Sequence, residues 1–194
     1  MPDFVVGITG ASGSIYGIRL IQELARRKHR VNVIVTSAGK KVMKEELGVT
    51  GFEHMDKLGL SAAAGQITTW DNDDYEAPFM SGSVASDAVV IVPCSVGKLA
   101  AIANGISSNL VERAADVALK EKRQLILVVR ETPLSLIHLE NMVKAARAGA
   151  QILPAMPAFY HHPKTIEDMV NFVVGKVLNL LRIEHDLFRG WKEE

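Results

Sequence analysis

The sequence has 194 residues, 48% hydrophobic and 23% charged, which fits one globular domain spanning 1–194 with a sizeable core. Its 22 basic and 22 acidic residues balance, so no bulk charge favours a nucleic acid or an anionic membrane as partner. Cys94 is the single cysteine, so no internal disulfide can form. Neither a signal peptide nor a membrane-spanning stretch is evident, and we expect a cytoplasmic protein.

The chain begins with a strand, a turn and a helix. An apolar run, Phe4–Thr9, leads into a glycine-rich turn and then an amphipathic stretch, Ser14–Lys28. Such a turn directs backbone N–H groups and the positive end of a helix at an anion, usually a phosphate. The dinucleotide fingerprint G-x-G-x-x-G is not matched by the glycines present, which are Gly7, Gly10, Gly13 and Gly17. The turn therefore indicates a phosphate-bearing ligand, but not specifically NAD.

The rest of the chain alternates strands with helices. Four runs rich in Val and Ile lack polar alternation, as expected for parallel strands buried on both faces: Val31–Thr36, Ala88–Pro93, Leu125–Val129 and Gln151–Leu153. Helical patterns cover Gly39–Leu47, Val96–Asn104, Leu110–Lys120, Ser135–Ala148 and Thr165–Leu181. Thr165 and Asp168 resemble a capping box, and Gly149 fits a helix end. This alternation predicts a doubly wound α/β sheet.

The stretch 48–86 interrupts the alternation. It contains a possible strand, Gln66–Trp70, an acidic patch, Asp71–Glu76, and a small-residue turn at Gly82 and Ser83. We interpret it as an excursion beside the site rather than as a second domain.

Ligands of doubly wound sheets bind at the carboxyl ends of the strands, so the residues after each predicted strand are the site candidates. They form a polar rim with small hydroxyl groups, two cations and one carboxylate: Gly10–Ser12, Thr36–Ser37, Cys94–Lys98, Arg130–Pro133 and Pro154–Tyr160. Arg130 and Glu131 are either functional or a surface ion pair of little energetic weight.

The remaining basic residues, histidines and the cysteine give weaker indications of function. Arg113 and Lys120 lie two turns apart on one helical face with Asp116 between them, so they are either a ligand-binding pair or part of a salt-bridge ladder. The six histidines show no metal-ligand spacing, and we expect no metal. Cys94 has no evident partner histidine, which favours a small buried side chain over a nucleophile.

Several motifs, in order and over nearly the whole chain, resemble the UbiX-type flavin prenyltransferases. They are T-G-A-S-G-S-I-Y-G (Thr9–Gly17), G-S (Gly82–Ser83), P-C-S (Pro93–Ser95), R-A-A-D-V-A-L-K-E (Arg113–Glu121), R-E-T-P-L (Arg130–Leu134), I-H-L-E-N-M (Ile137–Met142) and P-A-M-P-A-F-Y-H-H-P (Pro154–Pro163). Each motif is moderately specific, and together they are strongly so.

The resemblance implies a flavodoxin-like or Rossmann-like three-layer sandwich with a mostly parallel sheet, assembled as a homododecamer with sites at trimer contacts. It implies a metal-independent transferase that binds FMN and joins the dimethylallyl group of dimethylallyl phosphate to N5 and C6 of the reduced flavin. Phosphate is released, and UbiD-type decarboxylases receive the prenylated FMN.

The resemblance also implies roles for individual residues. Contacts to FMN are expected from Gly10, Ala11, Ser12, Thr36, Ser95, Val96, Gly97, Lys98 and Arg130. The donor phosphate is expected among Arg113, Lys120, Glu131, Tyr160 and Lys176, with Tyr75 lining the prenyl pocket. The residues expected in catalysis are Ser12, Glu46, Lys120 and Glu131. Lys98 and Lys176 depart from the family, which often has Thr and Arg at these positions, and a lysine cannot bind phosphate in a bidentate manner.

Two alternatives keep the same fold: an FMN-dependent decarboxylase or oxidoreductase, and a non-catalytic FMN-binding subunit of a decarboxylase. The sequence does not separate dimethylallyl phosphate from the pyrophosphate as donor. We further expect Trp191 and the terminal tail to pack on a neighbouring subunit or over the mouth of the site.

Overall fold

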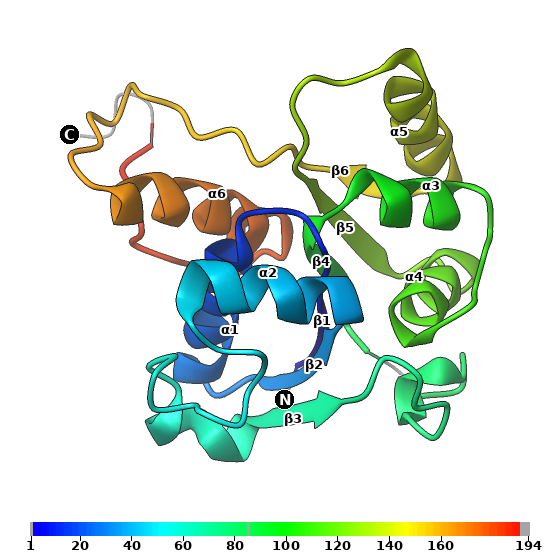
Figure 1. Cartoon of the computed structure of the whole chain (residues 1–194), viewed down its shortest axis with the longest axis horizontal. Helices are drawn as coiled ribbons and strands as arrows, with labels where there is room; N and C mark the ends of the chain where they lie inside the picture. Colours follow the sequence, from blue (N-terminus) through cyan, green and yellow to red (C-terminus); the bar gives the residue numbers. More distant parts are fainter. Residues whose placement is uncertain (1, 85, 191–194) are drawn as a thin grey trace.

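The computed structural model describes residues 2–84 and 86–190. Within these residues six strands form one parallel sheet in the order β3-β2-β1-β4-β5-β6 (Figure 1). This is the order of the doubly wound Rossmann sheet, and without the edge strand β3 it becomes the flavodoxin order. The predicted fold class is confirmed. The strands are β1 (Asp3–Ile8), β2 (Arg30–Val35), β3 (Ile67–Trp70), β4 (Ala88–Cys94), β5 (Gln124–Val129) and β6 (Gln151–Ile152).

Each predicted strand is confirmed to within one residue at either end. The possible strand at Gln66–Trp70 is β3, which pairs with β2 in the register Val31↔Ile67. The stretch 48–86 therefore supplies an edge of the same sheet, together with two short 3₁₀ turns at Ser61–Gln66 and Pro78–Met80.

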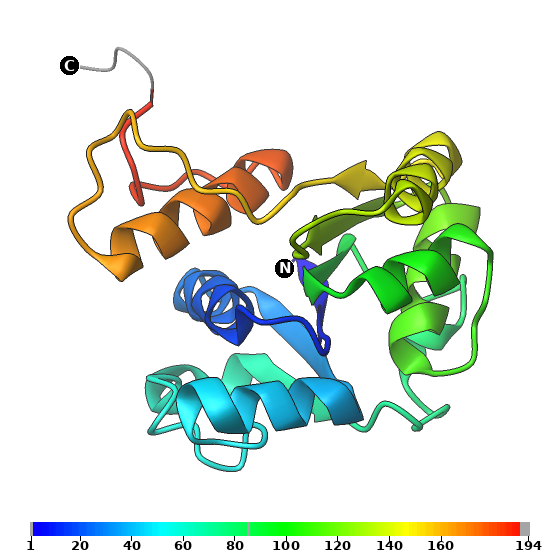
Figure 2. The same cartoon turned by 45° about the horizontal axis from the view of Figure 1, so that its top comes forward.

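Helices cover both faces of the sheet (Figures 1 and 2). One core joins Val6 and Ile8 of β1 to α1 and α6, and the other joins Val5 of the same strand to α3, α4 and α5. Alternate strand residues point to opposite faces, so runs of Val and Ile without polar alternation are what this architecture requires. The helices are α1 (Ser14–Arg26), α2 (Ser37–Leu47), α3 (Val96–Ala103), α4 (Leu110–Lys120), α5 (Leu136–Ala148) and α6 (Ile166–Leu180).

The predicted helix ends are set by local chemistry. The Thr165 hydroxyl accepts from the Asp168 N–H while the Asp168 carboxylate accepts from the Thr165 N–H, which confirms the capping box. Gly149 ends α5 with φ of 112°, as a residue without Cβ can do. The first helix ends at Arg26 instead of Lys28, because Lys28 has a positive φ of 63° and leaves the helical conformation.

Gly17 lets α1 lie against the carboxyl end of β4, and this contact generates a stability prediction. A Cβ at Gly17 would lie 2.6 Å from the Val92 carbonyl oxygen, so Gly17→Ala must move the helix. We expect a loss of about 2 kcal/mol in the free energy of unfolding, outweighing the gain in helix propensity of up to about 1 kcal/mol. Gly65→Ala is the matched control, because nothing lies within 4 Å of its added Cβ. Denaturant unfolding that shows equal stability for both variants would contradict this account.

Candidate active site

The buried side chain of Thr9 joins the loops that follow β1 and β4. Its hydroxyl donates to the Pro93 carbonyl at 2.7 Å and accepts from the Ser95 N–H at 2.8 Å. The chain order of the sheet reverses between β1 and β4, which is where doubly wound sheets bind ligands. This role could not be predicted from local patterns, because the partners of Thr9 lie more than 80 residues away.

The carboxylate of Glu46, near the end of α2, binds the glycine-rich turn. It accepts from the Gly13 N–H at 2.9 Å and from the Ser14 N–H at 2.8 Å. Burial alone would raise the pKa of Glu46, but hydrogen bonds from the Ser12 hydroxyl and from these two amides outweigh it and lower the pKa. The N-terminus of α1 therefore already holds an anion of this chain. These two amides are therefore bound within the chain, and the expectation of a ligand phosphate at this turn stays a prediction.

A hollow of about 350 Å³ opens beside this turn. Ser12, Glu46 and Arg130 line it together, so three of the predicted site residues meet here. Tyr16 also lines it, and the sequence analysis did not single it out. Its position in the S-I-Y-G part of the first motif could have indicated that it lies near the site. Burial raises the pKa of Tyr16, nearby Arg130 opposes the rise and Glu46 adds to it, so the phenol is neutral.

The loop after β4 caps α3 and brings Lys98 to a carboxylate. The Ser95 hydroxyl accepts from the Lys98 N–H at 3.4 Å, and the Lys98 ammonium pairs with Glu112 of α4. Glu112 is only 4% exposed and also accepts from the Ser108 N–H. Burial would raise its pKa, but Lys98 and the hydrogen bonds lower it overall. The ammonium of Lys98 is thus held by α4, so the predicted FMN contact rests on the rest of its loop, including Val96 and Gly97.

Two predicted rim residues make local bonds. Thr36 is buried and caps α2 by accepting from the Gly39 N–H at 3.0 Å. Glu131 accepts from the Thr132 N–H at 3.0 Å.

Cys94 is fully buried, and burial raises the pKa of its thiol to about 12, which confirms that it is a structural side chain.

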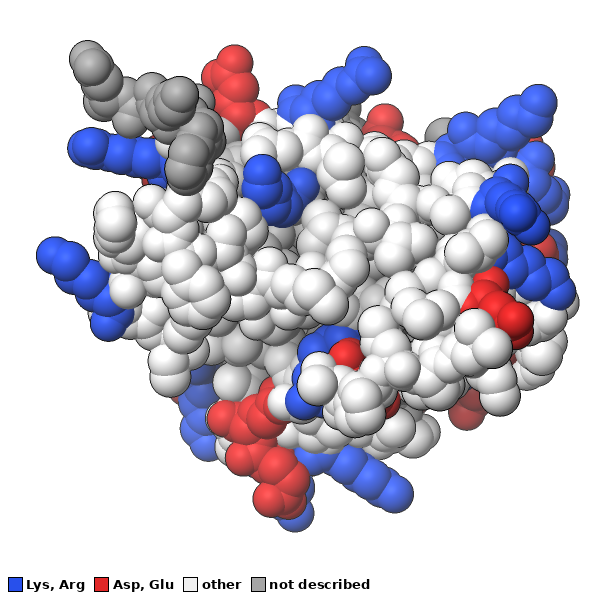
Figure 3. All heavy atoms as spheres, turned by 90° about the horizontal axis from the view of Figure 1, so that it is seen from above, with Lys and Arg blue, Asp and Glu red and all other residues white. Residues whose placement is uncertain are grey.

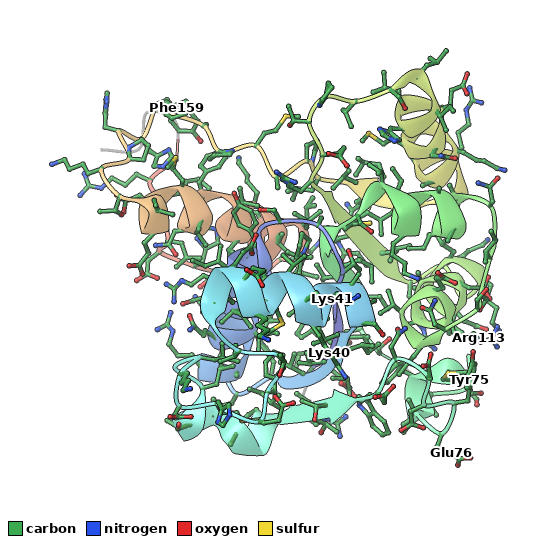
Figure 4. All side chains as sticks on the ribbon, in the orientation of Figure 1. Lys40, Lys41, Tyr75, Glu76, Arg113 and Phe159 are labelled. Atoms are coloured by element: carbon green, nitrogen blue, oxygen red, sulfur yellow. The ribbon has the colours of Figure 1, made fainter. Side chains whose placement is uncertain are left out.

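A second group of predicted residues lies on and beside α4, away from this rim (Figure 4). Arg113 donates to the Met80 carbonyl and pairs with Asp116 at 3.0 Å, and Tyr75 donates to the Ser108 carbonyl at 2.9 Å. Lys120 pairs with Glu121 rather than with Asp116, so the suggested salt-bridge ladder forms only in its first half.

Lys120 and Glu131 lie at opposite ends of β5. Lys120 ends α4 just before the turn into β5, whereas Glu131 follows the carboxyl end of this strand. The six residues of β5 separate these ends by about 20 Å. A third group, Tyr160 and Lys176, lies around α6, where the Lys176 ammonium stands 5.5 Å from the ring centre of Phe172. The three cations expected around the donor phosphate, Arg113, Lys120 and Lys176, therefore do not meet at the rim of a single chain.

Residues 2–84 and 86–190 contain no group of three His, Cys, Asp or Glu side chains placed to hold a metal ion. None of the helices in these ranges is long and apolar enough to cross a membrane. Trp191 lies outside the described residues.

The bonds of Glu46 generate a prediction with a defined pH dependence. We expect Glu46→Gln to lower the free energy of unfolding near pH 7 by at most about 1 kcal/mol, because solvent weakens the interactions of this exposed group. The lowered pKa means that the contribution is present above the unfolded value of 4.5 and is lost as the pH falls through the native value. Urea unfolding should therefore show the two proteins converging in acid. Glu45→Gln is the control on the same helix, and a difference that persists in acid would contradict the assignment.

The family model described as Flavoprotein matches residues 2–178. A flavin prenyltransferase UbiX from Halalkalibacterium halodurans is 51% identical, over 98% of this chain and 94% of the relative. Another from Alkalihalophilus pseudofirmus is 52% identical, over 97% of this chain and 95% of the relative.

Two solved structures share the fold over almost their whole length. AnUbiX (PadA1), in complex with FMN and dimethylallyl pyrophosphate, is 37% identical with a TM-score of 0.89, covering 100% of this chain and 98% of that one. A dodecameric FMN-dependent UbiX-like decarboxylase from Escherichia coli O157:H7 is 38% identical with a TM-score of 0.88, covering 98% of this chain and 100% of that one. Together with the motifs and the sheet order, these likenesses show that the chain belongs to the UbiX-type flavin prenyltransferase family of flavoproteins.

Proposed function

We propose that this chain is a flavin prenyltransferase that joins the dimethylallyl group of dimethylallyl phosphate to reduced FMN. The observation that carries the proposal is the identity of 51–52% with flavin prenyltransferases over nearly the whole chain. The AnUbiX complex supports it, because that protein holds FMN and dimethylallyl pyrophosphate on the same fold. The product would serve a UbiD-type decarboxylase, and we place the reaction in the cytoplasm.

The residues of the crevice fit a flavin mononucleotide. A Cβ at Gly10 would lie 2.5 Å from Cβ of Ala38, so this turn has room only for a residue without a side chain. The small side chains of Ala11 and Ser12 continue the cradle, and Arg130 supplies positive charge beside the hollow of about 350 Å³. We infer that Gly10–Ser12, Thr36, Ser95–Lys98 and Arg130 contact FMN.

In the reaction the bond between the allylic carbon and the phosphate oxygen breaks while this carbon bonds to flavin N5, which loses its proton. The C=C double bond of the prenyl group then takes up a proton, and its tertiary carbon bonds to C6, which loses a proton in turn. The flavin thus gains C5H8, and the remaining proton leaves with the phosphate. Arg113, Lys120, Tyr160 and Lys176 stabilise the charge that develops on the leaving phosphate. Tyr75, which is 55% exposed in the single chain, offers an aromatic wall for the allylic cation. Glu131 accepts a proton, and Ser12 with the ionised Glu46 relays another at the flavin edge.

The distribution of these groups favours sites built between subunits. Lys120 and Glu131 lie at opposite ends of β5, so a site that uses both must take them from different chains. Figure 3 shows a broad face whose charged side chains stand mostly at its margin. Several large apolar side chains are unusually exposed: Leu136, Ile137, Met156, Phe159 and Ile166 are between 62% and 71% accessible. Exposed apolar surface of this extent is typical of a subunit interface, which supports an oligomer. We propose a homododecamer because the UbiX-like decarboxylase of similar structure is dodecameric.

The reaction itself is tested by mass spectrometry. Purified protein incubated anaerobically with reduced FMN and dimethylallyl phosphate should yield a flavin heavier by one C5H8 unit, with release of inorganic phosphate. Dimethylallyl pyrophosphate in a parallel incubation determines the preferred donor. Bound FMN without such a product would contradict the proposal, and substrate-linked flavin redox turnover without the donor would favour an oxidoreductase or decarboxylase instead.

The shared site is tested by mixing two inactive variants. We expect Lys120→Ala and Glu131→Gln each to keep FMN and to lose prenyl transfer by 100-fold or more, in the order-of-magnitude range of a lost charge-stabilising group. Co-assembled at equal amounts, they should recover about a quarter of the wild-type rate, because random pairing leaves that share of sites intact in a symmetric oligomer. A mixture as inactive as its components would mean that both residues act within one chain.

A further inference from the structure

The segment after α6 turns back and packs on the helix that carries Lys176 (Figure 1). The contact is close at Gly175, where an added Cβ would lie 2.5 Å from Cε1 of Phe188 and 2.7 Å from Cε1 of His185. Glycine in a helix interior costs about 1 kcal/mol relative to alanine. The close approach of this segment, residues 184–189, gives the physical reason why α6 has a glycine there.

Two hydrogen bonds of His185 fix the segment. Its Nδ1 accepts from the Leu187 N–H at 3.2 Å, so the proton is on Nε2, which donates to Oδ1 of Asn179 at 3.1 Å. Burial lowers the pKa of His185, in keeping with the neutral ring that this arrangement requires. The imidazole thus ties the returning segment to the last turn of α6 and holds Phe188 beside the helix.

Phe188 and Phe172 form an aromatic platform under the Lys176 ammonium. The two ring centres lie 4.8 Å apart at an interplanar angle of 45°, and the Lys176 nitrogen lies 5.5 Å from each of them. Phe172 is one helical turn before Lys176, whereas Phe188 reaches the ammonium only because the segment folds back. Cation–π contacts of this kind contribute about 0.5–1 kcal/mol each at exposed sites.

The same platform also carries Tyr160. Its ring meets Phe172 edge-on at 5.8 Å, and the His161 ring stacks on Phe172 at 5.1 Å. A hollow of about 680 Å³ opens beside these rings, lined by Tyr160, Lys164, Phe188 and Arg189 among others. Two groups assigned above to the donor phosphate, the ring of Tyr160 and the ammonium of Lys176, therefore both contact Phe172. Tyr160 lines this hollow, whereas Lys176 lines another one together with Phe172.

We propose that Phe188 is a positioning residue that holds the Lys176 ammonium in place for the phosphate of the prenyl donor. The proposal rests on the function proposed above. A lysine ammonium is a point charge on a flexible four-carbon stem, with about 2 kcal/mol of rotamer entropy to lose when it is fixed. Contact of the ammonium with two rings restricts the rotamers of Lys176 before the donor binds. The N–H groups that point away from the rings can then donate to phosphate oxygens. Affinity gained in this way comes from preorganisation rather than from a new contact.

The test uses the FMN-loaded oligomer in its oxidised state, in which dimethylallyl phosphate can bind without turnover. We expect Lys176→Ala to weaken donor binding, measured by titration calorimetry, by tenfold or more. Phe188→Leu keeps the apolar packing but removes the ring, and should weaken it about fivefold. Phe188→Tyr keeps the aromatic face and should bind like wild type, and FMN affinity should stay unchanged in all three variants.

The decisive measurement is the double variant. If Phe188 acts through Lys176, Phe188→Leu has no further effect once Lys176 is alanine. The inference is overturned if Phe188→Leu weakens donor binding fivefold in the Lys176→Ala background as well. It is also overturned if the Phe188→Leu protein binds the donor like wild type. Neither result affects the proposed function, which is tested by prenyl transfer in wild type. Lys176→Ala with unaltered donor affinity in an active enzyme overturns the assigned role of Lys176 and the inference with it. Absence of both donor binding and prenylation in wild type would instead overturn the proposed function itself.

Discussion

The crevice of this protein depends on the bonds that the Thr9 hydroxyl makes between β1 and the loop after β4. Donating to Pro93 and accepting from Ser95, it fixes the two loops at the point where the sheet order reverses. Thr9 is fully buried, so neither bond competes with water, and a buried hydroxyl that lost a partner would carry a desolvation penalty of about 1–3 kcal/mol. This pair of strands fixes the relative positions of the segments around the crevice, which are the glycine-rich turn, the cap of α3 and the Arg130 loop.

Two carboxylates of the chain neutralise positive groups around this crevice. Glu46 holds the amides at the N-terminus of α1, and Glu112 holds the Lys98 ammonium. These groups would otherwise attract any phosphate at the rim. With these groups paired, Arg130 is the cation that lines the hollow beside Ser12. The groups proposed above to bind the donor phosphate lie on or around α4 and α6. In the proposed function these internal pairs would separate the place for FMN from the place for the donor phosphate. The lowered pKa values of Glu46 and Glu112 keep both carboxylates ionised at neutral pH.

Local patterns were sufficient to predict the strands, the helices and the caps, because periodicity, capping boxes and glycine conformations are set by neighbouring residues. The rule that ligands bind at strand carboxyl ends then selected Ser12 and Arg130 from the residues alone. Thr9 and Tyr16 were missed, since their partners lie on elements distant in the sequence. Glu46 was found only by resemblance, because nothing in an exposed helical glutamate predicts that it reaches another helix. The spacing of Arg113 and Lys120 correctly placed them on one helix, but a helix face does not tell toward which end of the sheet each residue points.

The placement of the cations explains why a balanced net charge is compatible with the proposed site for a phosphate dianion. Gathering Arg113, Lys120, Arg130 and Lys176 within one chain would oppose folding, because like charges at short distance raise the free energy until a ligand arrives. In the single chain each of the first two is paired with a neighbouring carboxylate, and Lys176 rests on aromatic rings. In the proposed oligomer, burial of the exposed apolar side chains would offset this repulsion, so the energy that concentrates the charge would come from subunit contacts and not from the fold of one subunit. The exposed apolar side chains and the dispersed cations would then act together, because the first supply the energy that brings the second close to one another.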